Sequence, residues 1–305
     1  MFKKKYALSL IFPLCLSLFL LSCSSLSPLT TAPKTVPPKA ELPEDLAPRW
    51  QFFAQGIDYF EGRIRNPRLE LWALKVDLTE TSLELVVNGE GPAPGIIPST
   101  TISGFVRDHG CIAGINTNPF APVSARVGED RTITGITVSG GILIAAPHPP
   151  FGALVFYTDG AAAIVEQAAL GEPGSIRNAV GGFYMVLQDG AVTEQTRARS
   201  KARHPRSAAG LSADGKTLYL LVIDGRRPGS IGATEAETGL ILGQLGAWDG
   251  LNFDGGGSTA LALRYPDGSV RAVNTPIHKG IPRRERAVAT CLGLKLRPPQ
   301  PVSDK

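Results

Sequence analysis

The sequence predicts an α+β fold, a single domain with a mixed, largely antiparallel β-sheet and few helices. Short β-branched or alternating apolar runs outnumber helical patterns from residue 50 to residue 296. Asp-Gly pairs at 159–160, 189–190, 214–215 and 267–268 favour hairpin turns. Strands and helices do not alternate regularly, as they would in a doubly wound parallel sheet. The hydrophobic content of 43% supplies a core and excludes collagen-like or wholly disordered chains.

Strands are predicted wherever an apolar or alternating run is bounded by Gly, Pro, Asn or Asp. In chain order they are residues 69–77, 82–87, 110–116, 132–139, 153–157, 161–166, 179–188, 207–212, 217–224, 250–254, 259–263, 270–274 and 286–294.

Two segments have helical patterns, residues 99–109 and 234–247. The second begins with a capping box, in which Thr234 accepts a bond from the third amide and Glu237 reaches back to the Thr234 amide. Leu240, Ile241 and Leu245 mark its buried face.

The N-terminus reads as an export signal followed by a tether. A basic start and an apolar run form a signal over 1–22, and Leu20-Leu21-Ser22-Cys23 resembles a lipobox whose Cys23 becomes lipid-modified. The alternative is an uncleaved anchor, but about 16 apolar residues are short for a bilayer of roughly 30 Å. Residues 23–48 are rich in Ser, Pro and Thr and predict a disordered tether, residues 49–298 the folded domain, and 299–305 a tail. We therefore expect an exported bacterial lipoprotein, held by its lipid at the periplasmic face of a membrane or at the cell surface.

Charge and cysteine content narrow the function further. The net charge of +4 comes from 31 basic and 27 acidic residues, and without Lys3, Lys4 and Lys5 it falls to 28 against 27, or +1. No basic stripe interleaved with aromatic residues follows, so a nucleic-acid partner is not expected. Cys111 and Cys291 lie in apolar, strand-like runs and are predicted to be buried free thiols, although an exported compartment would permit a disulfide.

The segment 218–263 carries the clearest chemical pattern. Asp224 and Asp254 each follow a strand, and the capped helix lies between these strands. Helical crossovers usually join parallel neighbours, so both carboxylates are expected at one edge of the sheet. The glycines 255–257 predict a nest of amides for a phosphate, and Arg206, Arg226 and Arg227 supply guanidinium groups. The alternative is a glycine-rich turn beside solvated arginines.

From His204 to Leu263 the chain resembles the phosphodiester glycosidase family, the domains related to N-acetylglucosamine-1-phosphodiester α-N-acetylglucosaminidase. The resemblance rests on HPR, DGR, the helix with its Glu, and NFDGGGS, and it extends through GINTNPF, RNAVGGFYMV and RERAVATCLGL to cover about 102–296. The chain departs from the family pattern after Asn116, where it has Thr117, Asn118 and Pro119, and at Glu235 and Thr238 in the helix. The characteristic positions that it matches are Asn116, Asn178, His204, Arg206, Asp224, Arg226, Glu237, Asn252, Asp254, Gly255, Gly256, Gly257, Ser258 and Arg286.

The resemblance implies hydrolysis of a sugar-1-phosphate diester at the anomeric carbon, on a carbohydrate of the cell envelope or an exopolysaccharide. It implies Asp254, Asp224 and Glu237 as catalytic carboxylates and the other matched residues as substrate or phosphate ligands, whereas the sequence pattern alone makes Glu237 a capping residue. No cofactor is assigned, and a Ca²⁺ or Mg²⁺ ion held by Asp224, Asp254 and Asn252 is left open. Two alternatives also remain: a non-catalytic glycan-binding lipoprotein, and a metal-dependent phosphodiesterase that cuts the P–O bond.

Overall fold

The computed structural model describes residues 46–89, 91–171, 173–199 and 201–297, all within the compact unit 39–305. The signal segment, most of the tether, the tail and Cys23 lie outside the described residues. The fold is 45% strand and 12% helix in one domain, which confirms the predicted α+β class. All ladders between the named strands are antiparallel, and they are distributed over several sheets.

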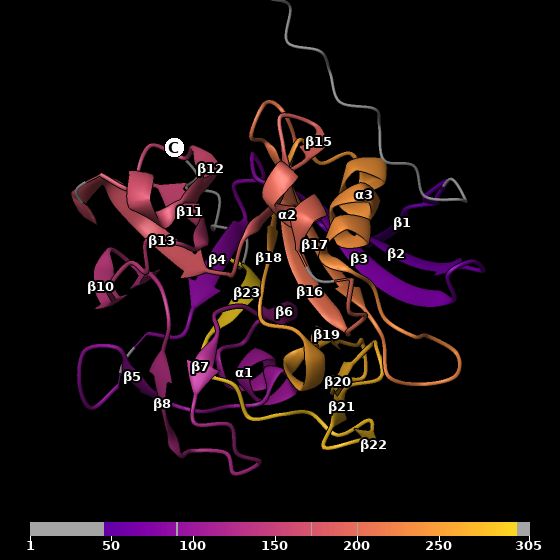
Figure 1. Ribbon diagram of the computed structural model, residues 1–305. Coiled ribbons are helices and arrows are strands. Elements are labelled where there is room, and N and C mark those ends of the chain that lie inside the picture. Colours follow the sequence, from indigo (N-terminus) through magenta and orange to yellow (C-terminus); the bar gives the residue numbers. More distant parts are fainter. Residues whose placement is uncertain (1–45, 90, 172, 200, 298–305) are drawn as a thin grey trace, which may run out of the picture. The chain divides into compact units, whose positions relative to one another are not determined.

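The largest sheet has eight strands, and its central strands carry the chemistry described below (Figure 1). Their order is β1 (Gln51–Ala54), β2 (Ile57–Ile64), β3 (Leu69–Asp77), β17 (Thr217–Ile223), β16 (Arg206–Leu211), β18 (Asp249–Asn252), β14 (Met185–Gln188) and β15 (Ala191–Val192).

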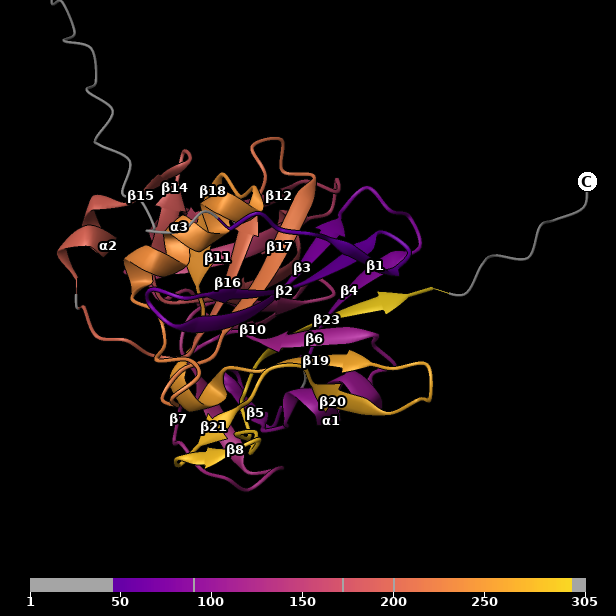
Figure 2. The ribbon, with the colours of Figure 1, turned by 90° about the vertical axis from the view of Figure 1, so that its right-hand side faces the viewer.

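Two five-stranded sheets pack on one side of the eight-stranded sheet, as the turned view shows for the lower one (Figure 2). One has the order β10 (Ile142–Ala145), β9 (Thr137–Ser139), β13 (Ile176–Gly181), β11 (Gly152–Tyr157) and β12 (Ala162–Glu166). The other has the order β20 (Val270–Ala272), β19 (Leu261–Arg264), β6 (Ala113–Asn116), β23 (Cys291–Leu296) and β4 (Leu83–Val87). Smaller sheets pair β5 (Ile96–Pro98), β8 (Asp130–Ile133) and β7 (Phe120–Ala121), and β21 (Ile277–His278) with β22 (Ile281–Pro282).

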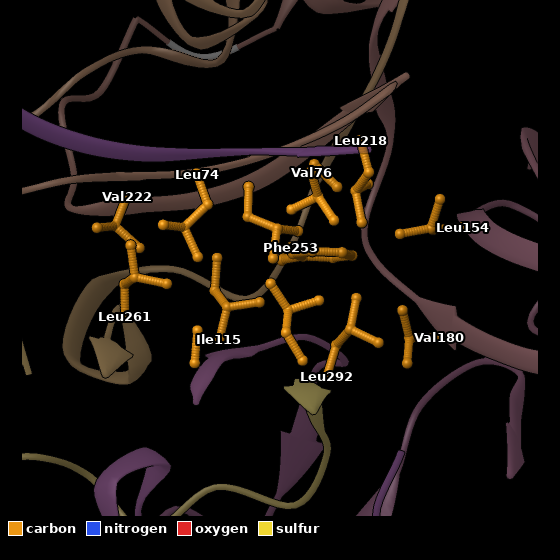
Figure 3. Packing of buried hydrophobic residues seen from close by; sticks show 14 of the residues in the cluster. Leu74, Val76, Ile115, Leu154, Val180, Leu218, Val222, Phe253, Leu261 and Leu292 are labelled. Atoms are coloured by element: carbon orange, nitrogen blue, oxygen red, sulfur yellow. The ribbon is translucent and has the colours of Figure 1, made fainter. Parts of the chain in front are cut away.

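The main core lies where these sheets face one another. Leu74 and Val222 of the eight-stranded sheet pack toward Ile115 and Leu292 of the sheet that contains β6 and β23, here called the third sheet, with Phe253 between them (Figure 3). The other face of the eight-stranded sheet is covered by α3 (Glu235–Leu245), and α1 (Ile102–Asp108) covers the outer face of the third sheet. A short α2 (Glu194–Ala198) contacts α3. Burial on both faces explains why β17 is an almost continuous apolar run.

Glycines divide two of the predicted strands. The run 132–139 breaks into β8 and β9 at Gly135, whose φ of +93° is strained for other residues. The run 179–188 breaks into β13 and β14, which join different sheets. A Cβ on Gly182, in that break, would lie 2.6 Å from the carbonyl oxygen of Asn252, so the close approach requires glycine. The strand predicted over 286–294 begins only at Cys291, and the strands β1 and β2 were not predicted.

Both predicted helices form within their expected ranges, and Cys111 and Cys291 are free and buried, as expected from their apolar context. Burial raises the pKa of the Cys111 thiol to about 11 and raises that of Cys291 as well. Neither thiol is therefore reactive at neutral pH. Among the residues that the structure describes, no helix is long and apolar enough to span a bilayer.

Candidate functional site

One edge of the eight-stranded sheet gathers most of the predicted site residues. Both β17 and β18 pair antiparallel with β16, so they run parallel to each other with β16 between them. Asp224 and Asp254 therefore follow strands that end at the same edge, as predicted. The expectation that the strands are neighbours is wrong, because β16 separates them by two strand spacings, or about 10 Å. Arg206, the first residue of β16, lies between the two strand ends.

Asp254 is a partly buried carboxyl group with an unusual proton affinity. Burial raises its pKa from 3.8 to about 6, and this effect exceeds the opposing effects of the Ser258 hydroxyl, the nearby Arg286 and the Gly255 amide. Its backbone is fixed on both sides, since its amide donates to the Thr117 carbonyl over 2.8 Å and its carbonyl accepts from Asn116 over 2.6 Å. A group that is ionised at pH 7 but close to its pKa suits proton transfer.

Two arginines lie against the glycine loop that follows Asp254. A Cβ on Gly256 would lie 3.0 Å from Nη2 of Arg226, and a Cβ on Gly257 would lie 2.5 Å from Nη2 of Arg286. Glycine is thus required for both guanidinium groups to come this close. Burial lowers the pKa of Arg286, the charge of Asp254 opposes this effect, and the like charge of Arg226 lowers the pKa further. An anion placed between the two side chains would relieve this repulsion.

The glycine loop does not form the predicted nest of amides. The Gly256 amide already donates to the Pro205 carbonyl over 2.8 Å, and the Gly255 amide bonds the carboxylate of Asp254. A Cβ on Gly255 would lie 2.7 Å from that same Pro205 oxygen, so Gly255 serves close packing against the start of β16. The loop therefore allows Arg226 and Arg286 to pack against it, and an anion would bind to these cationic side chains rather than to three amides.

Asp224, the second carboxylate that the resemblance implies, is held by several hydrogen-bond donors. This carboxylate is 1% exposed and accepts bonds from Arg227, from the Asn274 side chain over 3.0 Å and from the Thr275 amide. Arg227 also pairs with Glu70 at the start of β3. Burial raises the pKa of Asp224, while these donors lower it. Asp224 thus ties three segments of the chain together, and its oxygens are already occupied.

Arg206 is likewise engaged inside the protein. Its Nε donates to the Ala233 carbonyl over 2.9 Å, its Nη2 donates to the Ala202 carbonyl, and Nη1 lies 3.5 Å from Glu235. Glu235 also pairs with Arg199 over 2.7 Å, which explains an acid at a helix position where the family usually has leucine. Arg206 therefore supports the start of α3 and is not free to bind phosphate.

Glu237 completes the capping box of α3, as the sequence pattern predicted. It accepts from the Thr234 amide over 2.9 Å, and Arg203 donates to both of its oxygens over 2.6 and 2.7 Å. These bonds direct its carboxylate to the helix start rather than to the reacting edge.

The matched asparagines have structural partners. Asn116 holds the Asp254 carbonyl and accepts from Ser207 over 2.7 Å. Asn178 lies on β13 and bonds the Gly140 amide and the Leu85 carbonyl, so it is not brought to the glycine loop. Asn118, at the departure from the family pattern, accepts from the Gly181 amide and donates to three carbonyls at 134–136.

Of three further matched residues, Asn252 precedes Asp254 by two positions, and Ser258 and His204 each lie against one of the arginines. Asn252 is buried, and its Oδ1 has no partner among the described residues. Ser258 bonds Arg286 over 3.1 Å. His204 lies beside Arg226, with 3.4 Å between Nδ1 and Nη2.

The oxygen ligands expected for Ca²⁺ or Mg²⁺ do not fit such an ion. The oxygens of Asp224 accept N–H donors, and a guanidinium group lies near the oxygens of Asp254. A hard cation needs several free oxygen ligands. The described ranges hold no cluster of three or more His, Cys, Asp or Glu side chains that could bind a metal.

Sequence reasoning missed Asn274 and Arg203, which donate to the predicted carboxylates Asp224 and Glu237, and Glu70, which pairs with the Arg227 beside Asp224. They are far from those carboxylates in sequence or stand in no motif; Arg227 and Glu70, for example, are 157 residues apart. It also missed His278, which accepts from Nε of Arg286 over 3.1 Å. No spacing pattern connects these residues, so no sequence signal identifies them.

Comparisons with known proteins identify the family and the fold. The family model described as phosphodiester glycosidase matches residues 109–295. No curated protein matches the sequence. Among solved structures, the catalytic domain of zebrafish N-acetylglucosamine-1-phosphodiester alpha-N-acetylglucosaminidase, described as auto-inhibited by its pro-peptide, is similar with a TM-score of 0.60 and 18% identity over 79% of this chain and 83% of that one.

Two further structures share the fold. A hypothetical protein from Synechocystis has a TM-score of 0.62 and 15% identity over 82% of this chain, which spans 64% of that protein's length. A putative exported protein from Burkholderia pseudomallei has a TM-score of 0.53 and 17% identity over 75% of this chain and 74% of that one. The family match covers more than half of the sequence and includes Asp254, the glycine loop and both arginines. The chain belongs to the phosphodiester glycosidase family.

Proposed function

We propose that this protein hydrolyses a sugar-1-phosphate diester at the anomeric carbon and releases a free sugar and a phosphomonoester. The observation that carries the proposal is the placement of Asp254, whose pKa is about 6, beside a glycine loop against which the guanidinium groups of Arg226 and Arg286 lie. The carboxylate of Asp254 can act on water at the sugar, and the guanidinium groups of Arg226 and Arg286 can hold the departing phosphate.

Arg226 and Arg286 stabilise the leaving group. A phosphodiester carries one negative charge, and the phosphomonoester that leaves gains a second as the bond to the sugar breaks. Positive groups fixed where charge develops stabilise the transition state more than the ground state. Arg226 is exposed, and neither arginine forms an ion pair within the described part of the chain, so their charge is available.

Asp254 acts as the general base. It accepts a proton from water, the water oxygen bonds to the anomeric carbon, and the bond from that carbon to the phosphate oxygen breaks with its electron pair on the oxygen. Phosphate is a good leaving group, so the reaction does not depend on a second carboxyl group as an acid. The bonds that hold Asp224 and Glu237 support this assignment, and inversion at the anomeric carbon is expected.

The test is hydrolysis of sugar-1-phosphate diesters in ¹⁸O-labelled water, with the released phosphomonoester analysed by mass spectrometry. Cleavage at the anomeric carbon leaves the phosphomonoester unlabelled. Label in the phosphomonoester would refute the proposal in favour of P–O cleavage. No turnover with any diester, together with measurable glycan binding, would favour a binding protein.

Matched variants connect the activity to this site. Asp254→Asn should abolish turnover, whereas Asp249→Asn at the other end of the same strand should retain it. Asp249 is a suitable control because it is also partly buried with a pKa raised by burial. Equal loss in both variants would indicate damage to β18 rather than to catalysis.

We also propose that the substrate is a carbohydrate of the cell envelope or an exopolysaccharide, and that the protein reaches it as an exported lipoprotein. The lipobox-like Leu20–Cys23 segment supports this location. Labelling with a radioactive fatty acid in the bacterial host tests it, because the label should be carried by Cys23.

A further inference from the structure

The two arginines of the glycine loop differ from their neighbours in what holds them. Arg199, Arg203 and Arg227 each pair with a carboxylate. Arg286 instead donates from Nε to Nδ1 of His278 over 3.1 Å, and Arg226 lies 3.4 Å from Nδ1 of His204. Both arginines that face the proposed phosphate site therefore have an imidazole partner.

The choice of partner matters for the charge of the site. A carboxylate would orient an arginine but would also cancel its charge and compete with the substrate phosphate. A neutral imidazole accepts one hydrogen bond and leaves the full positive charge. Burial lowers the pKa of His278, and the neighbouring Arg286, Arg284 and Lys279 lower it further. The ring is therefore neutral at pH 7.

The side chain of His278 is buried, and its described polar contact is the hydrogen bond from Arg286. It is 1% exposed, it lies on β21, and its Nε2 has no partner among the described residues. Because Nδ1 accepts from Arg286, the ring proton is on Nε2. The bond through Nδ1 is the one polar contact that fixes this ring within the described part of the chain. The ring keeps this contact although its buried Nε2–H without a described partner is unfavourable.

Arg286 connects His278 with Ser258, which lies near Asp254. While Nε of Arg286 is held by His278, Nη1 donates to Ser258 over 3.1 Å, and Ser258 is one of the groups that lower the pKa of Asp254. The remaining nitrogen, Nη2, lies over Gly257 with no acceptor among the described residues. Two of the three guanidinium nitrogens are thus fixed, and the third is left to an anion.

We propose that His278 is a positioning residue that holds Arg286 fully charged against Gly257, ready for the substrate phosphate. The inference rests on the proposed function, because it assigns Arg286 to the phosphate. His204 stands in the corresponding place beside Arg226.

Three substitutions of His278 separate orientation, charge and packing. His278→Asn keeps an acceptor near the position of Nδ1, His278→Leu keeps an apolar side chain of similar size without an acceptor, and His278→Asp keeps an acceptor but adds a negative charge. The full-length protein and each variant are titrated with inorganic phosphate by calorimetry, and kcat, KM and thermal stability are measured beside it. His109→Leu is the control, since His109 bonds within α1 and is remote from the glycine loop in sequence.

We expect His278→Leu to weaken phosphate binding about tenfold, which corresponds to about 1.4 kcal/mol. His278→Asn should stay within about threefold of the wild type. His278→Asp should melt no lower than His278→Leu and yet bind phosphate poorly, because Arg286 is neutralised. A role in packing alone would instead be rescued by Leu.

The inference is overturned if His278→Leu or His278→Asp binds phosphate as tightly as the wild type. It is also overturned if His278→Asn is as defective as His278→Leu while remaining folded. Failure of the wild type to bind phosphate at all would refute the phosphate site of the proposed function itself. The two failures are therefore distinguishable.

Discussion

Replacing Asp254 by asparagine is expected to make the protein more stable while removing its activity. The carboxyl group is partly buried, and its pKa rises from 3.8 to about 6 because burial disfavours the charged form. That value already contains the favourable effects of Ser258, Arg286 and the Gly255 amide. Ionised Asp254 is therefore a net cost to folding, which asparagine does not carry.

The size and the pH dependence of this cost follow from the two pKa values. Between pH 3.8 and about 6 the folded protein retains a proton that the unfolded chain has released, so the contribution of Asp254 to stability falls as the pH rises through this window. The difference corresponds to about 3 kcal/mol at neutral pH, at about 1.4 kcal/mol for each pKa unit. Asp254→Asn should gain up to about this amount at pH 7 and almost nothing at pH 4.

Denaturant unfolding of wild type and variant from pH 4 to pH 7.5 measures the difference directly. In the same range, kcat/KM of the wild type should rise with an apparent pKa near 6, because the base must be ionised. The variant should lose about 100-fold or more in kcat. A variant that is less stable than the wild type at pH 7, or a stability difference that does not change with pH, would refute the argument from burial. Near-normal turnover would remove Asp254 from the mechanism.

Four further outcomes are expected. Arg226→Ala should raise KM for the diester and weaken phosphate binding without changing the melting temperature, because Arg226 is exposed. Arg206→Ala should instead lower the melting temperature, because two backbone carbonyls lose a buried donor. Calorimetry and activity assays on both variants test this contrast. Asp224→Ala should destabilise the fold by about 3 kcal/mol in denaturant unfolding, since it leaves the Asn274 side chain and the Thr275 amide without their acceptor, and a stable variant would contradict the assigned role. Glu237→Gln should keep the helix cap and more than half of the activity. A loss of activity as large as that of the Asp254 variant would indicate that Glu237 is catalytic. Cys23→Ser should release the protein from the membrane fraction of the host, and retention would show that the apolar run itself is the anchor.

Local chemistry made much of this fold predictable from the sequence. The capping box at Thr234 and the helix that it begins are decided within four residues, because the bonds that start a helix are local. The α+β class follows from short apolar runs and Asp-Gly turns, which act over similarly short distances. The motif around Asp254 likewise indicates the glycine loop from neighbouring residues, and together with the other short motifs it indicates the family.

Only the tertiary structure decided which of these residues are available for chemistry. Asp224 looks equivalent to Asp254 along the chain, but Asn274, 50 residues away, and Arg227 occupy its oxygens. Arg206 and Arg226 likewise look alike, although the first is buried against carbonyl groups and the second is exposed.

The same holds for the strand between the two aspartates and for the partner of Arg286. The crossover through α3 sets both strand ends at one edge, but β16 is inserted between them by pairings that the local pattern does not encode. The bond from Arg286 to His278 depends on the short hairpin of β21 and β22, and His278 belongs to no motif. Charge, burial and hydrogen-bond partners are properties of segments brought together by folding, so the sequence determined which chemical groups are present and the tertiary structure determined which of them can act.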